Sequence, residues 1–405
     1  MKNKKSYEVT IIGGGVCGCA IAYHLAKEGV RVALVEKVDI CSAASGANLG
    51  FSVLSYRQNP ITLKMAQDQL SILRKLSQEL EIDIEYAETG GLIPITSQEE
   101  LQILSSLVDR CNEWGFKEIK IVNPQRANQQ EPALDQKKII AAVYCPLEGI
   151  LNPFNLTIGF ANAAKRNGAD IYINSSVIGF EIANKRIKDI ILPTEKIKTN
   201  LVISTAGAWT RELINKVGID LPIHYERGEA MVSSPVSRII KGAVTDGRLF
   251  TEYSFISNMK VGACLAQSAS GGVILAQSTT EGEDYNVQNS PFGLRLVARR
   301  VLSFFPALKN LNIIRMWSGL VSYSEDKQPV FGFLDNPTNM FIVTGFHSAI
   351  GIASAIGNMV KEVYFRGVSS YDVSAYSPLR FIQKNKKIVN WLLFFIVTGG
   401  EGLDV

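Results

Sequence analysis

Three glycines and one glutamate near the N-terminus have residue types and a spacing that suit the binding of a dinucleotide. They are Gly13, Gly15, Gly18 and Glu36. In a dinucleotide-binding turn, the first glycine allows a tight bend, the second lets the backbone approach a pyrophosphate, and the third lets a helix pack closely on a strand. The N–H groups and positive dipole at the start of that helix attract phosphates. An acid about 20 residues later accepts hydrogen bonds from the adenosine ribose, which is the role expected of Glu36.

The elements that such a turn needs follow one another in the right order. Residues 9–12 form a short apolar strand, residues 19–29 have the composition of a helix that ends at glycine, and residues 31–35 form a second strand. The glycines alone are a weak signal, but strand, turn, helix, strand and acid together favour a Rossmann-type βαβ unit. His24 lies in the helix and is interpreted as a packing residue.

Small residues follow the second strand, and they carry a resemblance. Residues 39–50 read Asp-Ile-Cys-Ser-Ala-Ala-Ser-Gly-Ala-Asn-Leu-Gly. This segment resembles the corresponding one in the D-amino-acid-oxidase-like superfamily of FAD-dependent oxidoreductases. In that superfamily the segment runs along the pyrophosphate and under the isoalloxazine ring, where small residues permit close approach. The resemblance therefore implies FAD rather than NAD as the cofactor.

Further segments resemble the same superfamily, so that the matches extend from about residue 6 to about residue 381. They are residues 144–153, the strand and Ala-Gly-x-Trp turn at 201–209, residues 317–332, and residues 341–352 before an Ala/Gly-rich helix that runs to about residue 367. In relatives this last helix points its N-terminus at the flavin pyrimidine ring, and its dipole stabilises the reduced flavin. Here Ile350 and Gly351 stand about one residue out of step with the usual glycine spacing.

The resemblance implies a set of residues that contact FAD. Val177 belongs to it as a residue of the strand after Gly168, with its backbone facing the adenine. The full set is Gly13, Gly15, Val16, Cys17, Gly18, Glu36, Lys37, Ser42, Ala44, Ser45, Asn48, Val177, Ala206, Gly207, Trp209, Gly319, Gly345, Ala349, Ile350 and Gly351. The covalent flavin attachments of some relatives have no counterpart, because residues 317–326 contain no cysteine and residues 41–50 no histidine. The FAD is therefore expected to be non-covalent.

The implied fold class is α/β, with a Rossmann-type FAD-binding domain interlaced with a mixed α+β substrate domain. The 405 residues exceed what one hydrophobic core organises. The FAD-binding domain is expected to take residues 1–90, 140–220 and 325–381, the substrate domain 91–139 and 221–324, and a C-terminal extension 382–405. Apolar spacing predicts helices at 61–80, 97–114 and 291–305 and strands at 271–277 and 313–317.

Three side chains are candidate catalytic residues at the substrate. His347 directly precedes the flavin-facing helix, Tyr253 lies in the expected substrate domain, and Tyr323 lies in the turn before Asp326. A half-buried tyrosine more often has a packing role, and a satisfied structural histidine is the alternative for His347. The three are therefore hypotheses about the pocket rather than a diagnostic catalytic arrangement.

One position departs from relatives that bind amino acids. Those relatives often carry an arginine directly after the Gly-Leu pair that matches residues 319–320, where it clamps the substrate carboxylate. This chain has Val321 there, so a carboxylate partner, where one is needed, has to come from elsewhere. Arg227 and Arg315 are candidates, although ion pairs are the preferred interpretation for both.

The most similar relatives by motif are the sarcosine, proline and glycine (hydrogen-cyanide-synthase-like) dehydrogenase subunits. The resemblance implies an oxidoreductase that transfers a hydride from a CH–NH bond of a small amino acid or amine to flavin N5. Two alternatives stay open: a CH–OH dehydrogenase of the glycerol-3-phosphate or 2-hydroxy-acid type, and an FAD-binding subunit without turnover. Several relatives work with electron-transfer subunits, so such a subunit is an expected partner beside the small-molecule substrate.

Composition limits the partners and the cellular compartment that are expected for the protein. A net charge of +4 with no lysine-rich block gives no reason to expect nucleic acid as a partner. The six cysteines are scattered, which favours reduced thiols in the cytoplasm and no metal site. The first five residues lead straight into a strand, so no signal peptide is expected.

The C-terminal tail combines lysines with an apolar run at residues 388–397 that is too short to span a bilayer. Packing against the protein or a partner is the preferred interpretation; peripheral membrane contact and an ill-defined tail are the alternatives.

Overall fold

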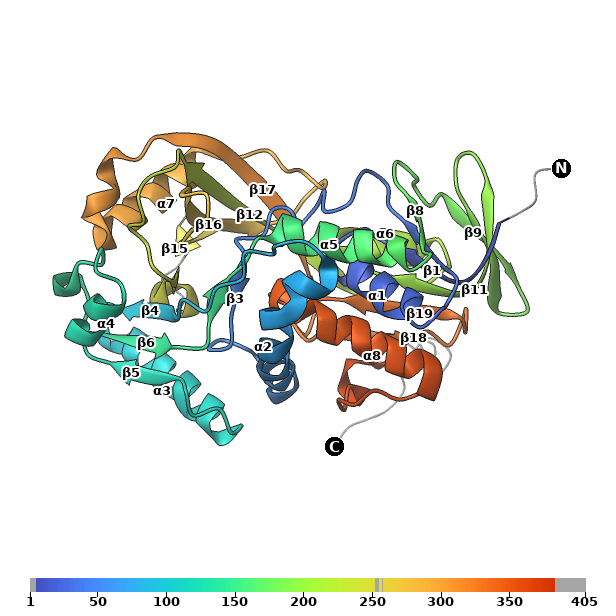
Figure 1. Cartoon of the computed structure of the whole chain (residues 1–405), viewed down its shortest axis with the longest axis horizontal. Coiled ribbons are helices and arrows are strands. Elements are labelled where there is room, and N and C mark those ends of the chain that lie inside the picture. The colour runs from blue at the N-terminus through green and yellow to red at the C-terminus, as the bar shows by residue number, and fades with distance from the viewer. Residues whose placement is uncertain (1–4, 252–254, 257, 383–405) are drawn as a thin grey trace, which may run out of the picture.

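The computed structural model describes residues 5–251, 255–256 and 258–382. Tyr253 and residues 383–405, which include the apolar tail, lie outside the described residues. Two large sheets dominate the described chain, and each has helices packed beside it (Figure 1). No helix in the described part of the chain is both long enough and apolar enough to cross a membrane.

The first sheet is built around parallel strands in the order β18–β19–β11–β1–β2–β8. β1 pairs in parallel with both β2 and β11, and β11 pairs in parallel with β19. Strands covered on both faces are apolar throughout, and β2 shows this with four buried residues. The bounds are β1 (Ser6–Ile12), β2 (Val32–Val35), β8 (Asp170–Tyr172), β11 (Lys196–Ser204), β18 (Val330–Phe333) and β19 (Met340–Thr344), and the hairpin of β9 (Gly179–Ala183) and β10 (Arg186–Ile191) is attached to β11. Ligands of such sheets bind at the carboxyl ends of the strands, where the strand order reverses, and here that place is the end of β1.

Three helices pack side by side over this sheet, although they come from distant parts of the chain. They are α1 (Val16–Ala26), α5 (Pro153–Arg166) and α8 (Ala353–Arg366) (Figure 1). The approach of α8 to α1 requires a glycine, because a Cβ on Gly357 would lie 2.8 Å from the carbonyl oxygen of Ala20. α2 (Pro60–Leu80) packs against α5 and α8, and α6 (Thr210–Asn215) follows β11.

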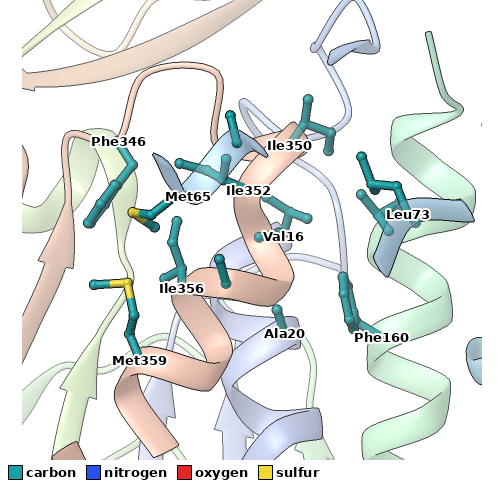
Figure 2. Close-up of a cluster of buried hydrophobic side chains, with 14 of the residues drawn as sticks. Val16, Ala20, Met65, Leu73, Phe160, Phe346, Ile350, Ile352, Ile356 and Met359 are labelled. Atoms are coloured by element: carbon teal, nitrogen blue, oxygen red, sulfur yellow. The ribbon is translucent and has the colours of Figure 1, made fainter. Parts of the chain in front are cut away.

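The apolar side chains between these helices hold the start of α8 in place. Figure 2 shows Met65 of α2 beside Phe346, Ile356 and Met359, and Val16 of α1 beside Ile352. All of these side chains belong to one buried cluster. The loop before α8 is therefore fixed by apolar packing against the helix of the glycine turn.

The second sheet is mostly antiparallel, with the order β17–β12–β16–β15–β13–β4–β6–β5. The bounds are β4 (Gly91–Ile95), β5 (Lys120–Val122), β6 (Ala141–Cys145), β12 (Ile223–Ser233), β13 (Ala243–Thr245), β15 (Met259–Gln267), β16 (Val273–Glu281) and β17 (Ile313–Ser324), and β14 (Phe255–Ile256) pairs with β15. α3 (Gln98–Glu113), α4 (Pro124–Gln130) and α7 (Pro291–Phe304) accompany it, and α7 packs on β15 and β16. A separate two-stranded pairing joins β3 (Phe51–Ser52) to β7 (Gly149–Ile150).

The three helices predicted from apolar spacing are present as α2, α3 and α7 within about two residues of their expected bounds. Each begins at a polar cap that sequence patterns favour: Asn59, Ser97 and Ser290 accept a hydrogen bond from a backbone N–H of the first turn. The predicted strands are also present, but longer, as β16 and β17. The mixed α/β architecture expected from the sequence is confirmed.

Two expectations need correction. β6 falls in the range 140–220 expected for the FAD-binding unit. It belongs instead to the second sheet, where all five of its residues pair with β4 and three of them also pair with β5. Tyr323 belongs to β17 and not to a turn, since β12 pairs with β17 as far as Ser324.

Candidate functional site

The glycine turn between β1 and α1 is tight enough to exclude side chains. Gly13 has φ +119°, and a Cβ on it would lie 2.4 Å from the carbonyl oxygen of Thr205. A Cβ on Gly18 would lie 2.0 Å from the carbonyl oxygen of Gly13. The hydroxyl of Thr205 donates to the Gly13 carbonyl at 2.9 Å, which joins the turn to the end of β11. The first and third glycines therefore have the packing roles that their spacing predicts.

The middle of the turn faces the small-residue segment. Gly15 is the N-cap of α1 in extended conformation, and a Cβ on it would lie 3.1 Å from the Ser45 hydroxyl. That hydroxyl accepts a hydrogen bond from the N–H of Val16 at 2.9 Å. The first turn of α1 itself holds no acidic residue. Val16 and Cys17 lie in this turn as expected.

Glu36 forms hydrogen bonds both with the glycine turn and with the loop that follows β8. Its carboxylate accepts hydrogen bonds from the N–H of Gly14 at 2.7 Å and of Val38 at 2.9 Å. Its own carbonyl accepts from the N–H of Ser175, in the loop after β8. A carboxylate has about four acceptor positions, so about two remain unused by these hydrogen bonds.

Val177 lies in that loop between β8 and β9 and not in a strand, which corrects the expectation for its conformation. Val177 and Ala206 both pack against the same large buried cluster of the first sheet.

Lys37 and Trp209 lie together. The Lys37 ammonium is 3.4 Å from the centroid of the Trp209 ring, a cation–π geometry, and Trp209 stacks on Tyr285 at 5.3 Å. Burial lowers the pKa of Lys37. Gly207 has φ +53° and begins the short turn of 3-10 helix that carries Trp209. Lys37, Trp209 and Tyr285 thus form a cluster of stacked side chains that begins next to Glu36 in the sequence and lies outside the glycine turn.

The second sheet reaches the first through the small-residue segment. The indole N–H of Trp317 donates to the carbonyl of Ala47 at 3.0 Å, and a Cβ on Gly319 would lie 2.4 Å from the Ala47 Cβ and 3.8 Å from the Ala44 Cα. Gly319 is paired with Gly228 of β12, where a Cβ would have no atom within 4 Å among the described residues. Open space therefore lies over Gly228, beside the segment expected to carry the flavin.

Asn48 and Ser42, also expected to contact FAD, lie in environments that differ from that of Ser45. Asn48 accepts the N–H of Gly50 at 2.7 Å, which shapes the end of the segment, and Ser42 is exposed at its start. Neither residue touches the glycine turn through a hydrogen bond in the described structure, whereas Ser45 does.

The loop after β19 brings a third group of expected residues to the same region. Gly345 and Ser348 both adopt positive φ, and residues Ala349–Ile352 form a short 3-10 helix before α8. A Cβ on Gly351 would lie 3.2 Å from the Ser52 hydroxyl and 3.6 Å from a guanidinium nitrogen of Arg57. The start of α8 is thereby seated on the chain that follows the small-residue segment.

Arg57 and Glu148 are buried charges that sequence patterns do not predict. Arg57 donates to the carbonyls of Val53 at 3.0 Å, His347 at 2.8 Å and Ser348 at 3.3 Å. Burial lowers its pKa to about 10. Glu148 accepts the N–H groups of residues 54 and 55, and burial raises its pKa. The only signal in the sequence is an isolated arginine after an apolar run and an acid within an otherwise apolar turn.

His347 and Tyr323 occupy different surroundings. Part of the His347 side chain is exposed to solvent, but its imidazole ring is surrounded by protein atoms. Desolvation of the ring lowers the pKa of His347, and the positive charges of Arg57, Lys260 and Lys327 lower this pKa further. Tyr323 donates to the Glu281 carboxylate at 2.6 Å, and burial raises its pKa. Tyr253 lies outside the described residues. The structure thus does not bring the expected catalytic candidates together by any direct contact among the residues it describes.

In the described part of the chain, neither arginine considered as a carboxylate partner has the ion pair expected for it. The Nε of Arg227 is buried without a hydrogen-bond partner there, and Arg315 is exposed on β17. Val321 is 39% exposed on the same strand, which leaves room where relatives carry arginine.

Comparisons with known proteins agree with this arrangement. Residues 8–363 match the family of FAD dependent oxidoreductases known as DAO. Mitochondrial dimethylglycine dehydrogenase of Mus musculus is 26% identical over 400 residues, covering 93% of this chain and 44% of that protein. Glycine oxidase of Geobacillus kaustophilus is 26% identical over 389 residues, covering 93% and 98%. The crystal structure of L-proline dehydrogenase from P. horikoshii superposes with a TM-score of 0.85 at 28% identity, covering 94% and 99%.

The chain spans less than half the length of the dimethylglycine dehydrogenase that it matches. The match to the family nevertheless extends from the glycine turn to the last helix described above. The small-residue segment, the glycine turn and the loop before α8 all lie inside it. The chain therefore belongs to the DAO family of FAD-dependent oxidoreductases.

Proposed function

We propose that this chain catalyses the FAD-dependent oxidation of a CH–NH bond in a small amino acid or amine. The observation that carries the proposal is the contact of Gly319 with Ala47, with open space over the paired Gly228. It leaves a place for a small molecule directly beside the segment expected to hold the flavin. Three of the similar proteins are named for glycine, L-proline and dimethylglycine, and all three compounds are small amino acids or their N-methyl derivatives.

The residues at the end of β1 fit the pyrophosphate and ribose of FAD. The cradle at Gly13 and Gly18 has no room for side chains, the start of α1 offers N–H groups, and Glu36 keeps acceptor capacity for hydroxyl groups. We assign the remaining contacts to the residue set expected from the sequence, with a non-covalent cofactor. When bound, FAD supplies the acceptor of the hydride at flavin N5.

The protein's own contribution on the substrate side is positioning and electrostatics. Arg57 fixes the backbone of His347 and Ser348, so the start of α8 is held at one place relative to the small-residue segment. His347 is kept mostly neutral at neutral pH because its pKa is lowered. A neutral imidazole can accept a proton from a substrate ammonium, which gives His347 a role in preparing the amine. Tyr323 is assigned a place at the edge of this site, held by Glu281.

The proposal is tested by anaerobic bleaching of the FAD-loaded protein. Glycine, sarcosine, L-proline, D-amino acids and 2-hydroxy acids are added in turn, and the loss of flavin absorbance is followed. We expect bleaching by at least one compound with a CH–NH bond. Bleaching by hydroxy acids alone would favour the CH–OH reaction, and bleaching by no donor would favour an FAD-binding subunit without turnover.

The electron acceptor is a separate part of the proposal. We propose that a partner subunit takes the electrons onward, as the resemblance implies. Reoxidation of the bleached protein by air within seconds would contradict this and favour an oxidase. Reoxidation by an artificial dye but only slowly by air would support it.

A further inference from the structure

Glu226 lies on β12, two residues before Gly228 and its open space. Residues two apart on a strand point to the same face of a sheet, so Glu226 and Gly228 share a face, with Cα atoms about 7 Å apart. Gly319, the partner of Gly228 on β17, shows which face this is, because its Cβ position is directed at Ala47. The Glu226 side chain is therefore on the sheet face that looks toward the small-residue segment.

The neighbouring strand places Glu226 between two parts of the proposed site. β17 runs beside β12 (Figure 1) and touches the first sheet's loops at two points. Gly319 contacts the small-residue segment, and farther along the strand a Cβ on Gly345, in the loop before α8, would lie 3.9 Å from the backbone nitrogen of Ser324. Glu226 pairs with Val321, which lies between these two contacts. Glu226 is thus positioned between the segment expected at the flavin and the loop before α8.

The carboxylate of Glu226 is a half-buried acceptor without a donor. It has no hydrogen-bond or ion-pair partner among the described residues. Burial raises the pKa of Glu226, as does the charge of Glu281, whereas the charges of Lys260 and Lys327 lower it. The same two lysines lower the pKa of His347, so Glu226 and His347 lie within reach of the same charges.

Glu281 is the neighbouring acid, but its carboxylate is already engaged. It pairs with Glu226 across β12 and β16, at the exposed end of β16, and accepts a hydrogen bond from the Tyr323 hydroxyl at 2.6 Å. Two carboxylates on neighbouring strands repel each other, and a cation bound beside them relieves that repulsion. A cationic ligand that enters the space over Gly228 therefore finds Glu226 as the acceptor without a partner.

We propose that Glu226 binds the amine of the substrate. This rests on the proposed function and names the residue that distinguishes an amine from an alcohol. The ionised carboxylate accepts charge-assisted hydrogen bonds from the N–H groups of a substrate ammonium, whereas a hydroxyl offers one uncharged donor. The substrate is thereby bound as a cationic amine, and a 2-hydroxy acid is bound more weakly in the same place.

Two probes of nearly the same shape test this assignment. 2-Aminoisobutyrate and 2-hydroxyisobutyrate differ in having an ammonium or a hydroxyl, and neither has a hydrogen on the substituted carbon, so neither can give up a hydride. FAD-loaded protein is titrated with each at neutral pH, with calorimetry and the flavin visible spectrum as readouts. We expect the wild type to bind the amine at least roughly tenfold more tightly than the alcohol, and Glu226→Gln to lose this preference.

Glu281→Gln is the matched control. It removes the same charge from the same row of the sheet, but from the carboxylate that Tyr323 already occupies. Its replacement is expected to change the preference for the amine by less than about threefold. Thermal unfolding and the flavin spectrum report folding and cofactor retention in each variant, and the ratio of the two probe affinities is an internal control within each protein.

An equal preference for the amine in the wild type and Glu226→Gln would overturn the assignment. So would a wild type that fails to bind 2-aminoisobutyrate or does not prefer it, or an equal loss of preference in Glu281→Gln. Failure of the proposed function is distinguishable, because the probes undergo no oxidation. A preference that depends on Glu226, with no bleaching by any donor, would support the amine site and reject the oxidation. Bleaching by an amine, with the preference unchanged in Glu226→Gln, would keep the oxidation and reject the role of Glu226.

Discussion

At the scale of single residues, the glycine turn depends on atoms that lie closer than any side chain allows. Gly18 is the sharpest case, since its Cβ position lies 2.0 Å from the Gly13 carbonyl oxygen and 2.6 Å from the Thr205 hydroxyl. Gly13 in turn is pressed against the end of β11. One added methyl group would therefore separate α1 from β1 and β11, and these three elements form the cradle assigned to the pyrophosphate.

Gly18→Ala is expected to lower the free energy of unfolding by about 1–3 kcal/mol, the usual cost of overpacking, and to weaken FAD binding by at least roughly tenfold. Denaturant unfolding and the quenching of FAD fluorescence measure the two effects. Gly179→Ala is the control, because its Cβ would make only an ordinary contact, 3.6 Å from the side chain of Ile191. An unchanged FAD affinity in Gly18→Ala would remove the turn from the cofactor site.

Residues differ in how far the sequence alone can predict them. Gly13, Gly18 and Glu36 lie within about one βαβ unit, so their spacing is a local pattern with a known geometry. Arg57 donates a hydrogen bond to the carbonyl of His347, which is 290 residues away in sequence, and no local pattern encodes such a contact. The same holds for Gly228, whose role follows from its pairing with Gly319.

At the scale of elements, α1 and α8 are joined by a polar contact inside their apolar interface. The ring of His24 is hydrogen-bonded to the Ser354 hydroxyl at 2.9 Å. Burial lowers the pKa of His24 from 6.5 to about 4, and the charge of Lys361 contributes in the same direction. The position of His24 between the two helices agrees with its interpretation as a packing residue.

This contact predicts a pH dependence of stability. The folded protein holds His24 neutral, whereas the unfolded chain takes up a proton as the pH falls below about 6.5. Stability contributed by His24 is therefore present above that pH and is lost toward pH 4. Between about pH 7.5 and pH 5 the loss is about 2 kcal/mol.

Urea unfolding at several pH values in that window measures the effect. His24→Gln can keep a hydrogen bond to Ser354 without titrating, so its unfolding free energy should fall less steeply on acidification than that of the wild type. Identical slopes for the two proteins would mean that His24 is protonated in the folded state.

Elements are easier to predict than the partners with which they pair. Helices α2, α3 and α7 follow from apolar spacing and polar caps, which are properties of neighbouring residues. The length of β17 and the sheet membership of β6 do not follow from such properties, because strand ends are set by pairing with segments far away in sequence. The prediction of a turn at Tyr323 is wrong for this reason.

At the scale of the whole molecule, the two sheets meet where the substrate is proposed to bind. The meeting point is held by the hydrogen bond from the Trp317 indole to the Ala47 carbonyl, together with the close contact of Gly319. The second sheet thus does more than cover the site. It contacts the small-residue segment at Ala47, whereas α1 contacts the same segment at Ser45.

Trp317→Phe keeps an aromatic ring in place but removes this hydrogen bond, so the Ala47 carbonyl loses its partner from the second sheet. We expect a loss of about 1 kcal/mol in unfolding free energy and about fivefold weaker FAD binding, because the segment is then held from one side only. Trp114→Phe is the matched control, since Trp114 follows the last residue of α3 and its ring contacts Arg110 of the same helix. Thermal unfolding and FAD titration of both variants distinguish the outcomes. If the two variants lose FAD affinity equally, the contact between the sheets does not position the cofactor segment, and the site must be organised by the first sheet alone.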